Sequence, residues 1–248
     1  MSRIPADLFL PLLTRPLVIS GPSGVGKSTL KDTLLKEFPF NFYFSVSHTT
    51  RGPRPGEKHG THYNFVTRAN FEDDIKAGMF LEFAEFSGNL YGTPVQPILQ
   101  NEQRCMLDIE SQGVQRVKER IREMVKASDS SWNLNPIYVF ICPPDGISLR
   151  ERLTRRGTET EEVIKKRLKT ARTEILYAKG VDGQGKDADG KDVYDLIIFN
   201  DKVEGDVKFE DTPAYQQFRD VAIGKEVSAE VKEAARKRLA ELRLEDFD

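Results

Sequence analysis

Residues Gly21–Thr29 constrain the fold of this chain more than any other stretch, and their sequence is GPSGVGKST. The apolar run 16–20 before them predicts a buried parallel strand. After them, apolar residues recur at helical spacing, at Leu30, Leu34, Leu35 and Phe38. A strand, a glycine-rich loop and a helix in this order form the context in which such a motif binds phosphate. We therefore predict a phosphate-binding loop at the start of the first helix.

The residue types inside this loop suit a nucleoside triphosphate. Gly21, Gly24 and Gly26 let the backbone turn so that its N–H groups point into one concavity at the positive end of the helix dipole. Lys27 can then reach the β- and γ-phosphates, and the Ser28 hydroxyl can ligate the accompanying Mg²⁺. The alternative is a plain glycine turn followed by a helix-capping serine, which does not account for the match at all four fixed positions and in both flanking elements.

The composition is that of an ordinary globular protein, and it narrows the possible partners. Hydrophobic residues make up 38% of the 248 residues and the formal net charge is −2, so no basic excess indicates a nucleic-acid partner. The apolar segment 8–13 is far shorter than the ~20 residues of a membrane helix, and we expect residues 1–15 to form a mobile arm with no membrane association. Cys105 and Cys142 lack metal-ligand spacing, which indicates buried, reduced thiols and a cytoplasmic location.

Alternating strand and helix patterns predict an α/β fold in which helices flank a parallel sheet. The expected core strands are 16–20, 42–46, 104–109, 137–141 and 195–201, and further helices are expected at 114–125 and 227–242. A small, mixed β-rich insertion is predicted from strands at 62–66 and 80–86, a helix at 70–77, a polar loop at 47–56 and a turn at 88–94.

The second half of the chain contains an arginine- and glutamate-rich segment, 149–167, followed by a helix with an apolar stripe through Ile164, Leu168, Ala171 and Ile175. Thr158 and Glu161 have the spacing of a capping box at the start of that helix. Residues 180–192 are rich in glycine and aspartate and predict a flexible surface loop rather than an EF-hand. We expect a nucleotide-binding core of residues 16–45, 95–145 and 172–248, an insertion of residues 46–94, and a mobile helical lid of residues 146–171.

Two groups of residues in the insertion are candidates for binding a second substrate. Arg51 and Arg54 lie three apart in a loop rich in proline and glycine, where their guanidinium groups can converge on one phosphate, with Tyr63 nearby in sequence. An ordinary solvated loop is an equally good interpretation. Period-two alternation places Glu82 on an apolar strand face with Phe80, where its carboxylate needs a partner. Guanine offers two parallel donors to it, and a salt bridge to an arginine is the competing interpretation.

Charged residues of the core and lid suggest phosphoryl transfer. The arginines of the charged segment are Arg150, Arg152, Arg155, Arg156 and Arg167. On an exposed helix they would pair with neighbouring glutamates, whereas over a bound triphosphate they would stabilise charge on the transferring group. Asp108, at the end of a core strand, lies where an acid can approach Mg²⁺, although an ordinary strand-end acid is nearly as good an interpretation.

Taken together, these motifs resemble the guanylate kinases from about Pro16 to Asp201. The segments that carry the resemblance are Gly21–Thr29, Ser45–Glu57, Tyr63–Phe65, Ser87–Gly92, Leu107–Glu110, Arg156–Thr160 and Asn200–Asp201. The resemblance implies a P-loop nucleotide kinase of purine nucleotide metabolism that moves the γ-phosphoryl group of ATP to GMP, giving ADP and GDP, with Mg²⁺. The chain departs from the family pattern at His48 and Glu110 and in longer loops at 126–135 and 181–192. None of these is a phosphate-contacting position.

The resemblance also assigns roles to individual positions. For ATP it implies Gly21, Ser23, Gly24, Val25, Gly26, Lys27, Ser28, Thr29 and, on the adenine side, Asn200. For GMP it implies Arg51, Arg54, Tyr63 and Tyr91 at the phosphate, Ser47, Glu82 and Thr93 at guanine, and Asp108 and Glu110 beside them. It implies catalytic roles for Lys27, Arg51, Arg152, Arg156 and Arg167, and a metal site at Ser28 and Asp108.

The expected mechanism is in-line transfer by positioning and charge neutralisation, without a general base, because the accepting phosphate is largely ionised at neutral pH. We expect a monomer whose substrates are ATP and GMP. Two alternatives are a catalytically inactive scaffold that binds phosphopeptides, against which the intact loop argues, and another nucleoside monophosphate kinase, against which Glu82, Ser47 and Thr93 argue.

Overall fold

The computed structural model describes residues 15–54, 56–86, 88–100, 103–126, 134–155, 160–203 and 205–248. Its main sheet is fully parallel, with strand order β2-β7-β1-β8-β9. The strands are β1 (Leu17–Ser20), β2 (Phe42–Phe44), β7 (Arg104–Asp108), β8 (Ile137–Cys142) and β9 (Leu196–Phe199). All five predicted core strands are therefore present, and most are shorter at their ends than the apolar runs suggested.

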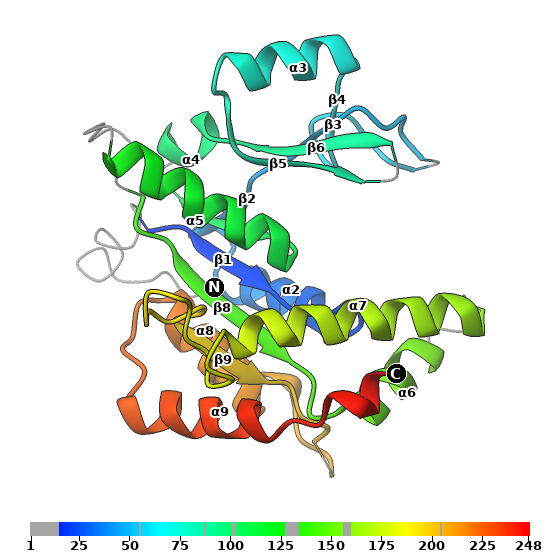
Figure 1. Cartoon of the computed structure of the whole chain (residues 1–248), viewed down its shortest axis with the longest axis vertical. Coiled ribbons are helices and arrows are strands. Elements are labelled where there is room, and N and C mark those ends of the chain that lie inside the picture. The colour runs from blue at the N-terminus through cyan, green and yellow to red at the C-terminus, as the bar shows by residue number, and fades with distance from the viewer. Residues whose placement is uncertain are drawn as a thin grey trace.

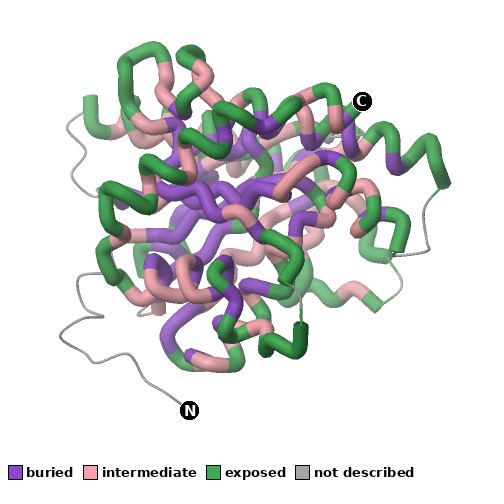
Figure 2. Tube along the Cα trace, turned by 90° about the horizontal axis from the view of Figure 1, so that it is seen from below, coloured by how far each residue is buried: buried purple, intermediate pink, exposed green. Residues whose placement is uncertain are grey.

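Helices cover both faces of this sheet, as Figure 1 shows. One face packs against α2 (Lys27–Glu37) and α8 (Pro213–Ala222), through residues such as Leu30, Leu34 and Phe218. The other face packs against α5 (Ser111–Lys126), α6 (Gly146–Arg155), α7 (Glu161–Lys179) and α9 (Ala229–Glu241). Buried stretches of the chain gather between these layers (Figure 2), so the central strands form continuous apolar runs.

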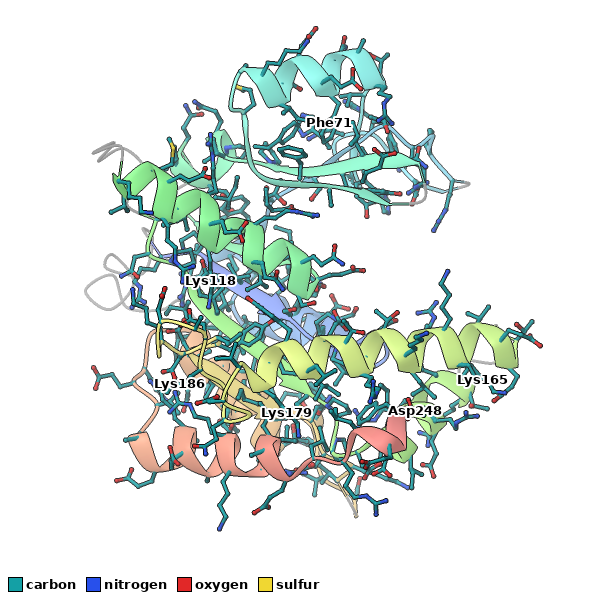
Figure 3. All side chains as sticks on the ribbon, in the orientation of Figure 1. Phe71, Lys118, Lys165, Lys179, Lys186 and Asp248 are labelled. Carbon is teal, nitrogen blue, oxygen red and sulfur yellow. The ribbon has the colours of Figure 1, made fainter. Side chains whose placement is uncertain are left out.

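The insertion between β2 and β7 forms a second sheet with the order β4-β3-β6-β5. Its strands are β3 (His48–Thr49), β4 (Asn64–Phe65), β5 (Phe80–Phe86) and β6 (Asn89–Pro94), and β3 pairs parallel with β4 but antiparallel with β6. Helix α3 (Arg68–Lys76) covers this sheet through Phe71, which stacks on Phe80 with ring centroids 4.4 Å apart (Figure 3). The short helix α4 (Gln96–Gln100) leads back to the core.

The structure corrects five local predictions. Residues predicted as a turn at 88–94 form strand β6 because they pair along β5. The predicted loop at 47–56 contains the short strand β3, and the predicted strand at 62–66 shrinks to Asn64–Phe65. Helix α8 was not predicted at all. The N-cap of α7 is Thr160, two residues after the predicted capping threonine, Thr158, which itself lies outside the described residues.

The remaining segments connect these elements on the surface. Residues 180–192 form a loop in which Asp182 accepts hydrogen bonds from the backbone of Gln184 and Lys186, and Asp187 accepts them from Asp189 and Lys191. Two short 3-10 helices complete the described elements, η2 (Phe209–Asp211) just before α8 and η3 (Leu244–Phe247) after α9. None of the helices in the described ranges has the length and apolar character needed to cross a bilayer.

Candidate active site

The glycine-rich loop connects β1 to α2 at the carboxyl edge of the main sheet. Gly21 and Gly26 have φ angles of +139° and +105°, which favour glycine. A Cβ on Gly21 would lie 2.2 Å from the Ile141 carbonyl oxygen, and one on Gly26 would lie 2.3 Å from Nδ2 of Asn200. Both positions therefore exclude a side chain, because strand β8 and Asn200 occupy the adjacent space.

Helix α2 begins at Lys27, with Gly26 as its N-cap and without a side-chain capping bond there. The Lys27 ammonium donates hydrogen bonds to the carbonyl oxygens of Gly21 and Pro22, the latter at 3.2 Å. Ser23 in the loop and Ser28 and Thr29 in the first turn of α2 are exposed. Uncapped N–H groups, the helix dipole and a lysine thus meet at one place, which is the arrangement that binds a polyphosphate.

Two predicted site residues brace this loop from the neighbouring elements. Asn200, which follows β9, donates from Nδ2 to the Val25 carbonyl oxygen at 2.7 Å. Arg152 of α6 donates to the same oxygen at 3.2 Å and to the Asn200 carbonyl oxygen at 2.6 Å. Burial lowers the pKa of Arg152, against the opposing charge of Asp201. The structure thus connects Arg152 and Asn200 directly to the phosphate-binding loop.

A second predicted arginine reaches the loop from α7, where Nη1 of Arg167 donates to the Ser23 hydroxyl. The third, Arg156, lies outside the described residues. Helices α6 and α7 therefore each contribute one arginine to the glycine loop.

In the insertion, Arg51 is the centre of a cluster with two aromatic rings. Its guanidinium carbon lies 5.5 Å from the ring centroid of Tyr63, which in turn is 6.0 Å from the ring of Tyr91. Glu57 binds Arg51 through two hydrogen bonds of 2.9 and 3.0 Å and accepts a third from the Arg54 backbone N–H at 2.7 Å. These hydrogen bonds lower the pKa of Glu57 to about 2. The structure thus gives Glu57, to which the sequence assigned no role, the position of an anion holding the arginine loop together.

The predicted guanine-binding residues Glu82 and Thr93 lie opposite each other on β5 and β6. The Thr93 hydroxyl donates to Oε1 of Glu82 at 2.7 Å, so its hydrogen-bond partner is a threonine rather than the arginine considered above. The register shifts between Phe80 and Glu82, and the strict alternation from which the face of Glu82 was predicted does not hold there. Ser47 lies just before β3, where its carbonyl oxygen accepts from the Asn64 N–H at 2.9 Å.

Glu82 also lines a cavity of about 470 Å³ between β5 and α5. Burial raises the pKa of Glu82, and the Thr93 hydrogen bond and the charge of Arg116 on α5 oppose that rise. Nη1 of Arg116 is buried without a hydrogen-bond partner. A carboxylate and an unpaired guanidinium N–H therefore border the same cavity, and sequence spacing did not single out Arg116.

The predicted strand-end acid Asp108 lies at the carboxyl end of β7, next to β1, where Lys31 of α2 forms an ion pair with it. Glu110 follows it just before α5. Glu174 of α7, to which the sequence assigned no role, is buried and accepts a hydrogen bond from the Ser111 backbone N–H. Its spacing of seven from Arg167 places both on one helix face, and that spacing was the available signal. Burial raises the pKa of Glu174 to about 7, although the Lys27 ammonium opposes this.

No cluster of three or more metal-ligating side chains occurs within the described ranges. The predicted metal-binding oxygens are the exposed Ser28 hydroxyl, in the first turn of α2, and the Asp108 carboxylate, which pairs with Lys31 of the same helix. This donor set suits Mg²⁺ bound mainly by phosphate oxygens and water, since such sites use only one or two protein ligands.

A parallel sheet with a glycine loop at its carboxyl edge, leading into a helix that begins with lysine, defines a P-loop nucleotide-binding protein. Residues 13–210 match the family model described as "Guanylate kinase". The chain belongs to the guanylate kinase family.

Individual relatives agree with this assignment. The guanylate kinase of Sus scrofa is 45% identical over 193 residues, which cover 77% of this chain and 86% of that protein. The guanylate kinase of Homo sapiens is 42% identical over 225 residues, covering 90% and 96%. A crystal structure of guanylate kinase from Anaplasma phagocytophilum matches with a TM-score of 0.54 and 27% identity, covering 92% of this chain and 94% of that one. The aligned part of guanylate kinase 1 from Arabidopsis thaliana is only 44% of that protein's length.

Proposed function

We propose that this protein transfers the γ-phosphoryl group of ATP to GMP, giving ADP and GDP, with Mg²⁺. The observation that carries the proposal is the connection of the insertion to the nucleotide-binding edge of the sheet. The insertion begins after the carboxyl end of β2, the glycine loop follows the carboxyl end of β1, and Asp108 is the last residue of β7. Ligands of open parallel sheets bind at this edge, so a donor on the loop and an acceptor on the insertion face a common region.

The donor side of the reaction rests on the glycine loop. Lys27 and the loop N–H groups bind the β- and γ-phosphates, and Arg167 adds positive charge from α7. Asn200 and Arg152 keep the loop in shape through the Val25 carbonyl oxygen. Ser28 and Asp108 would hold the Mg²⁺, which shields the phosphate charges when it is bound.

The acceptor side rests on the insertion. Arg51 and Arg54, with Tyr63 and Tyr91, hold the phosphate of GMP, and Arg51 exchanges part of its contact with Glu57 for that phosphate. The Glu82 carboxylate accepts from N1–H and N2–H₂ of guanine, while the Thr93 hydroxyl keeps it oriented. Ser47 and Glu110 complete the guanine side. No residue has to act as a general base, because the phosphate of GMP is already largely ionised.

A coupled assay of ADP release tests the proposal, with ATP and each of GMP, AMP, CMP and UMP as acceptors. We expect rapid turnover with GMP alone. Equal turnover with AMP would contradict the assignment of Glu82 to guanine, and no turnover with any acceptor would favour a binding scaffold. The variant Lys27→Ala should lose kcat by orders of magnitude while keeping the circular dichroism spectrum of the wild type.

The protein is further proposed to act as a cytoplasmic monomer. Light scattering after size-exclusion chromatography tests whether the protein is a monomer, for which the expected mass is near 28.2 kDa. A mass of twice that value, unchanged on dilution, would contradict it.

A further inference from the structure

Helix α9 and the turn η3 lie beyond residue 210, where the match to the family description ends. They nevertheless pack into the main core, since Leu239, Leu242 and Phe247 are buried there. Figure 3 labels Asp248 at the end of this segment, beside α6, and η3 contacts both α6 and α7. This C-terminal segment therefore contacts the helices that carry Arg152 and Arg167.

One residue of α9, Arg238, reaches the nucleotide-binding edge of the sheet. It donates two hydrogen bonds to the carboxylate of Asp201, of 2.9 and 2.5 Å, in the two-pronged geometry that arginine forms with carboxylates. Its guanidinium carbon lies 4.0 Å from the ring centroid of Phe199, the last residue of β9. Arg238 thus contacts the two residues that precede and follow Asn200 in the sequence.

Asp201 is also close to Arg152, because it directly follows Asn200, whose carbonyl oxygen accepts a hydrogen bond from Arg152 at 2.6 Å. In agreement with this, the Asp201 charge opposes the lowering of the Arg152 pKa by burial. The Arg152 guanidinium donates hydrogen bonds to two carbonyl oxygens, those of Val25 and Asn200. A carboxylate is a stronger acceptor for guanidinium than a neutral carbonyl. Without Arg238, the Asp201 carboxylate would therefore compete with the glycine loop for Arg152.

We propose that Arg238 is a positioning residue for ATP binding, which holds Asp201 away from Arg152 and so keeps Arg152 on the glycine loop. The side chains of Arg238 and Asp201 are 43% and 48% exposed, so their ion pair contributes little to the stability of the fold. Its effect falls instead on the shape of the loop that binds the triphosphate. This inference rests on the proposed function only through the choice of ATP as the ligand.

The test compares Arg238→Met with Arg236→Met, a matched control on the same helix. Arg236 forms an ion pair with Asp192 at 2.6 Å, in the surface loop 180–192, so its loss also removes one arginine–aspartate pair from α9. We expect Arg238→Met to raise the KM for ATP roughly three- to tenfold, the range of a modest coupling between adjacent groups. The KM for GMP should stay within about twofold, and Arg236→Met should change neither value.

A double-mutant cycle with Asp201→Asn separates positioning from simple loss of packing. Asparagine has no charge with which to attract Arg152, so Arg238→Met should have less than about a twofold effect on the KM for ATP in the Asp201→Asn background. An unchanged KM for ATP in Arg238→Met would overturn the proposal. The same increase in both backgrounds, or equal increases for ATP and GMP, would also overturn it.

The same cycle is read by calorimetry as the Kd of a non-hydrolysable ATP analogue, with no GMP present. This measurement separates the positioning role of Arg238 from the proposed use of GMP as the acceptor. If GMP is not the acceptor, the turnover assay fails, while the expected rise in Kd for Arg238→Met remains. If Arg238 has no positioning role, turnover with GMP remains and the Kd is unchanged.

Discussion

Glu174 allows a quantitative prediction, because it is a carboxyl group buried on the inner face of α7. The environment raises its pKa from the ordinary value of 4.5 to about 7, chiefly through loss of water. The fold therefore favours the protonated acid, and the side chain contributes an unfavourable free energy wherever it must ionise. We choose Glu174→Gln as the perturbation, since glutamine keeps the size of the side chain and can still accept from the Ser111 N–H.

The sign of the effect follows from proton binding. A group whose pKa is raised in the fold binds more protons in the folded than in the unfolded state between pH 4.5 and 7, so stability falls as the pH rises through this window. Above it, the penalty is constant. At roughly 1.36 kcal/mol for each pH unit, the interval from pH 5.5 to 7 corresponds to about 2 kcal/mol. The advantage of Glu174→Gln over the wild type should therefore grow by about that amount between pH 5.5 and 8.5.

The assay is urea unfolding of the nucleotide-free protein at both pH values, followed by circular dichroism. Glu119→Gln, which removes an exposed carboxylate from α5, corrects for the change in net charge. A difference in the free energy of unfolding between Glu174→Gln and the wild type that is the same at pH 5.5 and pH 8.5 would refute the reasoning. So would a difference that changes in favour of the wild type from pH 5.5 to pH 8.5.

Three further variants test the loop, the C-terminal segment and the guanine side. Gly26→Ala should weaken ATP binding and lower Tm, because a Cβ would collide with Asn200. The control is Gly60→Ala, where φ is +76° and no atom lies within 4 Å of the added Cβ, so only backbone strain is expected. Equal losses of ATP affinity in the two variants would contradict this. Phe247→Ala should cost about 3–5 kcal/mol in urea unfolding, since the ring is fully buried, and a cost below about 1 kcal/mol would count against a packing role for η3. Burial raises the pKa of Glu82, so on acidification the wild-type KM for GMP should begin to rise at a higher pH than it would with an ordinary carboxyl group. Glu82→Gln should have a high KM for GMP without this pH dependence. Parallel pH profiles of the two proteins would exclude the carboxylate as the guanine acceptor.

The main sheet was predictable because each of its strands is a short run rich in apolar residues. Strand β6 was not, since its sequence Asn89–Pro94 contains Gly92 and Pro94, which are typical of turns. In the fold, Gly92 is needed for packing, because a Cβ there would lie 2.8 Å from Phe71 and 2.9 Å from Phe80. A glycine that admits two aromatic rings and a glycine that turns the chain look the same in a single sequence.

Helix α8 differs, because its sequence does carry a helix-start signal. Thr212 caps the helix by accepting from the Tyr215 N–H, and Pro213 occupies the first helical turn. A threonine followed by proline is a typical helix start. The amphipathic pattern after it, with Tyr215 and Phe218 buried, supplies the rest. The local sequence of α8 therefore specifies a helix without help from tertiary contacts.

The arginines show where single-sequence reasoning meets a physical limit. The strand pattern placed Arg104 in an apolar run, yet its buried guanidinium donates to the carbonyl oxygens of Arg15, Val221 and Ala222. Arg152 likewise donates to two carbonyl oxygens from distant segments. Every residue has a carbonyl oxygen, so such a partner leaves no trace in the sequence, whereas a carboxylate partner does. Burial lowers the pKa of both arginines, because neutral acceptors do not offset the lost hydration as a carboxylate would. An arginine assigned to a phosphate from sequence can therefore already have structural partners, and for Arg152 those partners are in the loop that binds the phosphate.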